Sequence, residues 1–151
     1  MPDWDSSVLS GPEGEDWRVP VSELEQRLNA LADALQASSL PGVLIQHPID
    51  LYYFAGGRQD GTMFVPAQGA GGSAQAGGDG PVFYVRRSLQ RAQHEAGGEN
   101  APFIIEPFPR LRLLSETLQS RGVTDAPALQ FGELPTTFAN RFSNALSSLG
   151  T

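Results

Sequence analysis

Short apolar runs alternate with amphipathic segments along most of this 151-residue chain, and that alternation constrains its fold more than any other feature. The apolar runs have the length and the β-branched or aromatic content of buried strands. They predict strands at 43–46, 61–66, 81–87, 102–107 and 128–131. Strands that alternate with helices indicate an α/β fold, in which helices cover both faces of a largely parallel or mixed sheet.

The clearest expected helix begins near Val21 and ends before Pro41. Ser22 followed by Glu25 has the pattern of a capping box, in which the two side chains bond free backbone amides at the helix start. Leucines then recur at spacings of four, three and four, at Leu24, Leu28, Leu31 and Leu35. This repeat predicts an amphipathic helix.

Three further helices are expected on the same grounds. The first follows Ser88, and the second runs from Pro109 to a left-handed stop at Gly122. The third follows Pro135 and continues to the end of the chain. The apolar positions expected to share a face are, helix by helix, Leu89, Ala92 and Ala96; Leu111, Leu114 and Leu118; and Phe138, Phe142, Ala145 and Leu149.

The charge and the missing residue types argue against several kinds of function. A formal net charge of -7 argues against a nucleic-acid partner, because phosphate contacts need clustered cations. All ten basic residues are arginines, so a Schiff-base lysine and a P-loop lysine are both excluded. There is no cysteine, which excludes a thiolate nucleophile and a sulfur-ligated metal. No run of about 18 apolar residues and no signal peptide is present, which favours the cytoplasm and no membrane partner.

Two segments lie outside the expected elements. Residues 1–20 are acidic and are expected to form a mobile arm, which Trp4 and Trp17 pin to the folded domain at 21–151. Residues 67–80 include six glycines and join two expected strands. A phosphate cradle would need a helix directly after the glycines, so this segment is expected to be a flexible hairpin loop.

The residues alone supply no convincing catalytic set and no metal site. His47 and His94 stand in no metal-binding pattern, and Ser73 lies in the glycine-rich loop rather than in a nucleophile motif. Acidic residues near the expected strand ends leave a two-metal nuclease as a minor alternative. These residues are Asp50, Asp60, Glu106 and Glu133.

Arginines gather where the strand at 81–87 meets the next helix, at Arg86, Arg87 and Arg91. Guanidinium groups match carboxylates, so an anion site is one interpretation. Arg86 and Arg87 would point to opposite faces of a strand, which favours a solvated rim.

The stretch HPIDLYYFAGG at 47–57 is expected to be a tight aromatic turn between two strands. Asp50 is expected to cap this turn, because Asp accepts free amide donors. The aromatic pair Tyr53 and Phe54 is expected to divide between core faces and pack against the first helix. Gly56 is expected to provide the tight exit into the next strand.

The passage from ELEQRLNALADAL through GVLIQ to DLYYFAGG resembles the amino-terminal domain of the creatinase, aminopeptidase P and prolidase family. The family pattern at the turn falls on Asp50, Leu51, Tyr52, Tyr53 and Gly56. PVFYVRRSLQRAQHEA resembles the next strand and helix, so the resemblance covers roughly residues 20–150. It implies a mixed sheet of five to six strands with helices on both faces, a ribonuclease-H-like motif.

The resemblance also implies a role. In that family this domain is non-catalytic and precedes a pita-bread catalytic domain with two divalent metals, often manganese or cobalt; this chain lacks that second domain. The amino-terminal domain supports homodimerisation and shapes the partner subunit's substrate pocket. Tyr52, and more approximately Arg58, match positions that reach or bind substrate. The parent protein is therefore expected to be an Xaa-Pro aminopeptidase or dipeptidase, while this chain itself holds no cofactor.

Two departures from the family pattern leave alternatives open. Gly57 stands where an aromatic residue commonly follows the Gly, and the 67–80 insertion is longer than usual. One alternative is the corresponding domain of a creatinase-like amidinohydrolase or of an inactive relative. Another is a stand-alone module that uses residues 52–54 and Arg58 to bind a small anionic or amino-acid ligand.

Overall fold

The computed structural model describes residues 12–67, 80–130, 132 and 134–149, and these residues build one mixed five-stranded sheet. The strands are β1 (Gly42–Ile45), β2 (Gly61–Pro66), β3 (Val82–Val85), β4 (Ile104–Pro107) and β5 (Ala128–Leu129). Their order across the sheet is β4-β3-β2-β1-β5. The three central strands pair antiparallel, whereas β4 and β5 each pair parallel at the two edges. The 67–80 segment therefore joins two antiparallel neighbours, and residues 68–79 lie outside the described part.

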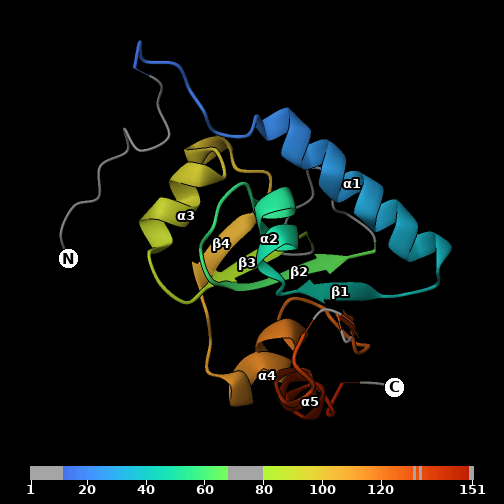
Figure 1. Ribbon diagram of the computed structural model, residues 1–151. Helices are drawn as coiled ribbons and strands as arrows, with labels where there is room; N and C mark the ends of the chain where they lie inside the picture. Colours follow the sequence, from blue (N-terminus) through green and yellow to red (C-terminus); the bar gives the residue numbers. More distant parts are fainter. Residues whose placement is uncertain (1–11, 68–79, 131, 133, 150–151) are drawn as a thin grey trace.

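Three helices cover one face of the sheet: α1 (Val21–Ala37), α2 (Pro48–Ala55) and α3 (Leu89–Glu95) (Figure 1). A short 3₁₀ turn (Gly98–Asn100) follows α3. Alternate strand residues point into this layer, because side chains of a strand alternate between its two faces. The sheet contributes Ile45, Met63, Val65, Phe83 and Val85, and α1 contributes Leu24, Leu28, Ala32 and Leu35.

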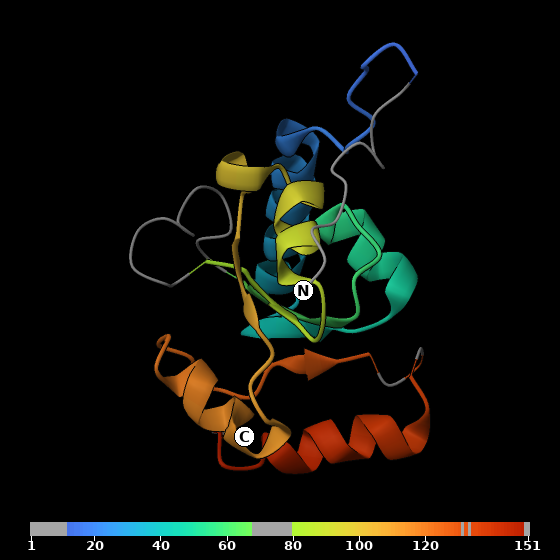
Figure 2. The same cartoon turned by 90° about the vertical axis from the view of Figure 1, so that its left-hand side faces the viewer.

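The opposite face is covered by α4 (Leu114–Gln119) and α5 (Thr136–Ala145), with a 3₁₀ turn (Leu111–Leu113) leading into α4. Figure 2 shows both helices beneath the sheet, on the side away from α1–α3. The remaining strand residues, Leu44, Phe64, Val82 and Tyr84, point into this second layer. They meet the buried side chains Leu114, Leu118, Phe142, Leu146 and Leu149. The α/β fold with a mixed sheet and helices on both faces is thus confirmed.

Several local predictions are also confirmed. Ala92 and Ala96 are buried, and Leu89 packs against the same cluster, as the spacing after Ser88 predicts. Gly122 has a left-handed φ of 89° just after α4, the conformation expected of a glycine stop.

Other local predictions are wrong. The capping box at Ser22 and Glu25 does not form, because α1 already begins at Val21 and the Pro20 carbonyl accepts the amides of Glu23 and Leu24. Ser22 therefore lies inside the helix, and the helix start has no side-chain cap. The last helix ends at Ala145 rather than continuing to the end of the chain.

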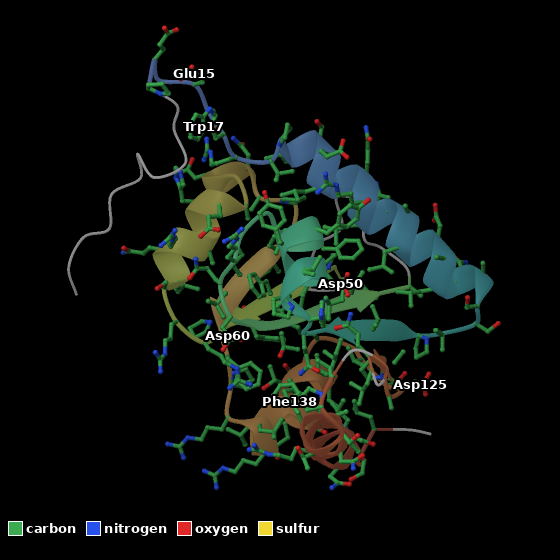
Figure 3. The ribbon with its side chains drawn as sticks, in the orientation of Figure 1. Glu15, Trp17, Asp50, Asp60, Asp125 and Phe138 are labelled. Atoms are coloured by element: carbon green, nitrogen blue, oxygen red, sulfur yellow. The ribbon has the colours of Figure 1, made fainter. Side chains whose placement is uncertain are left out.

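The amino-terminal arm reaches the domain through different residues from those expected. Trp17 is 62% exposed, and Trp4 lies outside the described residues. Val19 packs against the core instead, and the Arg18 guanidinium donates to the carbonyl of His94 at 3.3 Å. Figure 3 shows Trp17 projecting away from the sheet near the α3 side of the molecule. In the described part of the chain, no helix combines the length and apolar character needed to cross a membrane.

Candidate functional site

The aromatic stretch forms a two-turn helix, α2, rather than the expected tight turn. Pro48 occupies its first position, where a missing amide hydrogen costs nothing. Leu51 and Ala55 are buried against the core. Gly56 ends the helix with a left-handed φ of 81°, and its amide donates to the Tyr52 carbonyl at 3.0 Å. Gly56 thus closes a helix before the chain returns to β2.

One face of α2 is apolar and exposed. Ile49 is 72% exposed, and Tyr52 and Tyr53 are each 47% exposed. Positions three and four apart lie on the same side of a helix, so these three residues form one stripe, named here the α2 stripe. Apolar side chains gathered on one exposed face are typical of a surface that contacts another molecule.

The aromatic pair divides differently from the prediction. Phe54 packs against the core, as expected, but Tyr53 stays half exposed. Tyr53 reaches α1 through Arg27, whose guanidinium carbon lies 4.2 Å from the ring centroid. The same guanidinium donates to the Tyr53 carbonyl at 2.9 Å. Contact with α1 is therefore shown for Tyr53, as a cation–π contact at the surface, and Phe54 packs against the core cluster that includes the leucines of α1.

Asp50 does not cap α2, contrary to the prediction. It sits in the first turn, and its Oδ2 accepts a hydrogen bond from Nε2 of Gln130 at 2.7 Å. The Gln130 Oε1 in turn accepts the amides of Gln46 at 2.7 Å and His47 at 3.0 Å. Gln130 thus ties the end of β5 to the junction between β1 and α2. The amides just before α2 are thus bonded by a side chain that lies 83 and 84 residues away in the sequence.

The loop after α2 is held by Glu95, which belongs to none of the sequence patterns described above. Glu95 is only 4% exposed. Its Oε2 accepts the Arg58 amide at 3.0 Å, and its Oε1 accepts Nε2 of Gln59 at 2.6 Å. Arg91, one turn earlier on α3, donates to the same Oε1 at 3.2 Å. The buried carboxylate therefore has three donors, and it fixes the backbone that carries the Arg58 side chain.

Gly57 explains how the carboxylate comes so close. A Cβ built at this position would overlap Oε2 of Glu95 and approach the Glu95 Cβ to 2.8 Å. An aromatic residue, which the family pattern commonly has here, has no room in this chain. The departure from the family pattern at Gly57 is thus explained by Glu95, whose side chain fills the space beside it.

Tyr52 and Arg58 line one hollow of about 590 Å³ between the exposed face of α2 and the loop that follows. Its remaining lining residues are Pro48, Ile49, Leu51, Gln59 and Asp60. Figure 3 marks Asp50 on α2 and Asp60 just before β2. A hollow of this size with an aromatic ring, a guanidinium and a carboxylate on its wall has the size and the polar groups of a small-molecule binding site.

The other candidate residues do not converge. Among residues 12–67, 80–130, 132 and 134–149, no three His, Asp or Glu side chains lie close enough together to hold a metal ion. Glu133 and Ser73 lie outside the described residues. Glu106 instead pairs with Arg121 at 2.8 Å on the α4 side of the sheet. The described residues therefore give no support to a two-metal nuclease.

No protein-family model and no curated protein sequence matches this chain. Solved structures do match it. The dipeptidase PepE from Mycobacterium ulcerans matches with a TM-score of 0.63 and 19% identity over 89% of this chain. The N-terminal domain of the cytoplasmic peptidase PepQ from Mycobacterium tuberculosis gives a TM-score of 0.62 and 20% identity, covering 83% of this chain and 88% of that one. The Xaa-Pro dipeptidase from Bacillus anthracis gives a TM-score of 0.62 and 13% identity over 87% of this chain.

These matches confirm the predicted fold, that of the amino-terminal domain of Xaa-Pro peptidases. The domain structure from Mycobacterium tuberculosis is matched over most of its length. In contrast, this chain spans only 35% of the Mycobacterium ulcerans dipeptidase and 33% of the Bacillus anthracis enzyme. The matched region is therefore about a third of those whole peptidases.

Proposed function

We propose that this chain is the non-catalytic amino-terminal domain of an Xaa-Pro aminopeptidase- or dipeptidase-like metallopeptidase. Its role is to support a homodimer and to lend a wall to the substrate pocket of the partner subunit. The catalytic work belongs to a following domain with two divalent metals, manganese or cobalt. We place the parent protein in the cytoplasm, because a matched peptidase is described as cytoplasmic.

The observation that carries the proposal is the joint position of Tyr52 and Arg58 on one hollow. Both side chains are exposed to solvent, and Ile49 extends the apolar surface along α2. A phenol ring and a guanidinium on a shared wall suit a short peptide, because the ring contacts apolar side chains and the guanidinium binds a carboxylate. Glu95 supports this wall by holding the Arg58 backbone.

A wall that serves a second subunit can be tested by complementation within a mixed dimer of the two-domain parent. One subunit carries Tyr52→Ala and Arg58→Ala with an intact catalytic domain, and the other has an intact wall with its metal ligands replaced. If the wall serves the partner, the intact wall faces the intact catalytic centre in the mixed dimer. Mixed dimers should then hydrolyse Xaa-Pro peptides, whereas homodimers of either type should be impaired.

Tyr53→Ala is the matched control, because Tyr53 is exposed to the same extent on the same helix but does not line the hollow. In the homodimer we expect Tyr52→Ala to lower kcat/KM about tenfold, equivalent to about 1.4 kcal/mol of binding to the transition state. Tyr53→Ala, assayed as the dimer because Tyr53 belongs to the α2 stripe, should leave kcat/KM within about twofold. Equal activity of all these variants, or a parent with no catalytic segment after Thr151, would refute the proposal.

The hollow also favours a second candidate function, a stand-alone module for a small anionic or amino-acid ligand. Its volume lies within the range of about 300–1,000 Å³ that is usual for ligand pockets. This alternative predicts that the isolated chain is stabilised by a small molecule, by about 2.7 kcal/mol when the ligand is present at 100 times its Kd. A thermal-shift panel of amino acids, dipeptides and guanidino compounds distinguishes the two, because a dimer wall alone should show no shift.

A further inference from the structure

A second hollow of about 640 Å³ lies on the α5 side of the sheet, where the chain leaves β3 and β4. Its floor is aromatic. The Phe138 and Phe142 rings of α5 lie 5.0 Å apart, and Phe108, directly after β4, lies 6.3 Å from Phe142. Figure 3 shows Phe138 on α5, with Asp60 above it toward the sheet.

Three arginines from separate segments surround this floor: Arg86 after β3, Arg110 after β4, and Arg141 on α5. The Arg86 guanidinium lies 4.3 Å above the Phe108 ring. Arg110 and Arg141 are exposed, and neither forms an ion pair with any residue that the structure describes. Three of ten cations thus converge on one hollow in a chain of net charge -7.

Among the lining residues that the structure describes, Asp60 is the single carboxylate, and it lies 3.8 Å from the Arg86 guanidinium. Its side chain is largely exposed, so the pair is weak. The described lining therefore carries three positive charges and one negative charge. That balance attracts an anion, which would compete with Asp60 for Arg86.

We propose that this hollow binds a small anion that carries an aromatic ring, either a phosphate monoester or a carboxylate. The guanidinium groups bind the anionic group in the bidentate manner they favour, and the phenylalanine rings receive the aromatic group. The volume suits a small molecule. A small anion is favoured over a nucleic-acid strand, because the chain carries a net charge of -7, which opposes contacts with an extended phosphate backbone.

The test is a titration of the isolated chain with phenyl phosphate at low ionic strength. Binding is followed by NMR of the phenylalanine rings and of the Nε–H groups of the arginine side chains. Inorganic phosphate tests the anion alone, and benzyl alcohol tests the ring alone. Phenyl phosphate should bind more tightly than either and shift the Phe138 and Phe142 signals. A parallel titration with phenylacetate shows whether the site prefers a phosphate or a carboxylate, and tight binding of either supports the proposal.

Charge variants give results of opposite sign. Arg110→Gln and Arg141→Gln should each weaken binding about two- to fivefold, the range of an exposed ion pair. Asp60→Asn should strengthen binding to a similar extent, because Arg86 loses its competing carboxylate. Arg112→Gln removes an exposed arginine that does not line the hollow, and it should leave the affinity unchanged.

The proposal is overturned if inorganic phosphate binds as tightly as phenyl phosphate, or if neither aromatic anion shifts the ring signals. It is also overturned if Arg112→Gln weakens binding as much as Arg110→Gln, since that would indicate general attraction to positive charge. These outcomes concern residues on the α5 side of the sheet. Apart from Asp60, none of the substituted residues lines the first hollow, which contains Tyr52 and Arg58, so the result is separable from the function proposed above.

Discussion

The carboxylate of Glu95 occupies the space that a side chain at Gly57 would need, and it accepts the backbone amide of the very next residue, Arg58. The absence of a side chain at Gly57 therefore allows the buried Glu95 carboxylate to reach the backbone of this loop. Arg58, the candidate ligand-binding cation, owes its backbone position to this arrangement.

Gly57→Ala should destabilise the chain. The added Cβ overlaps the Glu95 carboxylate, whose three hydrogen bonds resist displacement. We expect the free energy of unfolding to fall by about 1–3 kcal/mol, the usual cost of overpacking a tight site. Urea denaturation measures this, with Gly132→Ala as the control because a Cβ there meets nothing within 4 Å. Equal stability of the two variants would contradict the arrangement.

Glu95→Ala should leave the Arg58 amide and the Gln59 side chain without their acceptor. Since buried donors that lose their partner cost about 1–3 kcal/mol each, we expect a loss of about 2–3 kcal/mol in unfolding free energy. Amide hydrogen exchange of Arg58 should accelerate at the same time. Glu99→Ala, an exposed acid just after α3, should change neither quantity. Unchanged exchange at Arg58 in the Glu95 variant would show that the loop is held by other contacts.

Gln130→Ala should loosen the junction between β1 and α2. The change removes the acceptor of the Gln46 and His47 amides and the donor to Asp50. We expect a loss of about 1–3 kcal/mol, measured by thermal or chemical unfolding. The exposed Gln93 on α3 offers a matched control, because Gln93→Ala keeps the same change of residue type without these bonds. A stability equal to that of the control would argue that water replaces the glutamine.

The pKa of Asp16 should be about 2, lowered mainly by its side-chain hydrogen bond with Arg18 and also by the Arg18 backbone amide. A carboxyl group with a lowered pKa stabilises the folded state above its unfolded pKa, and this contribution is lost as the pH falls toward 2. NMR titration of the Asp16 carboxyl carbon measures the pKa directly. In Arg18→Gln the value should rise toward 3.8, the ordinary value. An unchanged low pKa in that variant would assign the shift to another cause.

The layers of this fold could be predicted from the sequence because they depend on local patterns. The leucine repeat of α1 and the short apolar runs of the strands have clear periods of about 3.6 and 2 residues. The helix α2 was not predicted, because Ile, Tyr and Phe have weak helix propensity and also suit strands and turns. Pro48 at the first position was the available sign of a helix start.

The supports of the candidate site could not be predicted in the same way. Glu95 bonds residues 36 and 37 positions earlier, and Gln130 bonds residues more than 80 positions earlier. Such contacts depend on the finished sheet order, which brings β5 beside β1. Tyr52 and Arg58 were predicted separately from the family pattern, and their common hollow depends on α2 and on its left-handed end at Gly56.

The two edges of the sheet set a condition on how this chain can assemble. β5 has only two residues, and β4 ends at Pro107, with Pro109 shortly after it. Proline has no amide hydrogen to donate, and a very short strand offers few free groups, so neither edge is a good template for a strand from another molecule. Assembly by continuing the sheet is therefore disfavoured. Helix surfaces remain for contacts between copies of the chain, and the α2 stripe holds three of the six large hydrophobic side chains that are exposed in the described part of the chain.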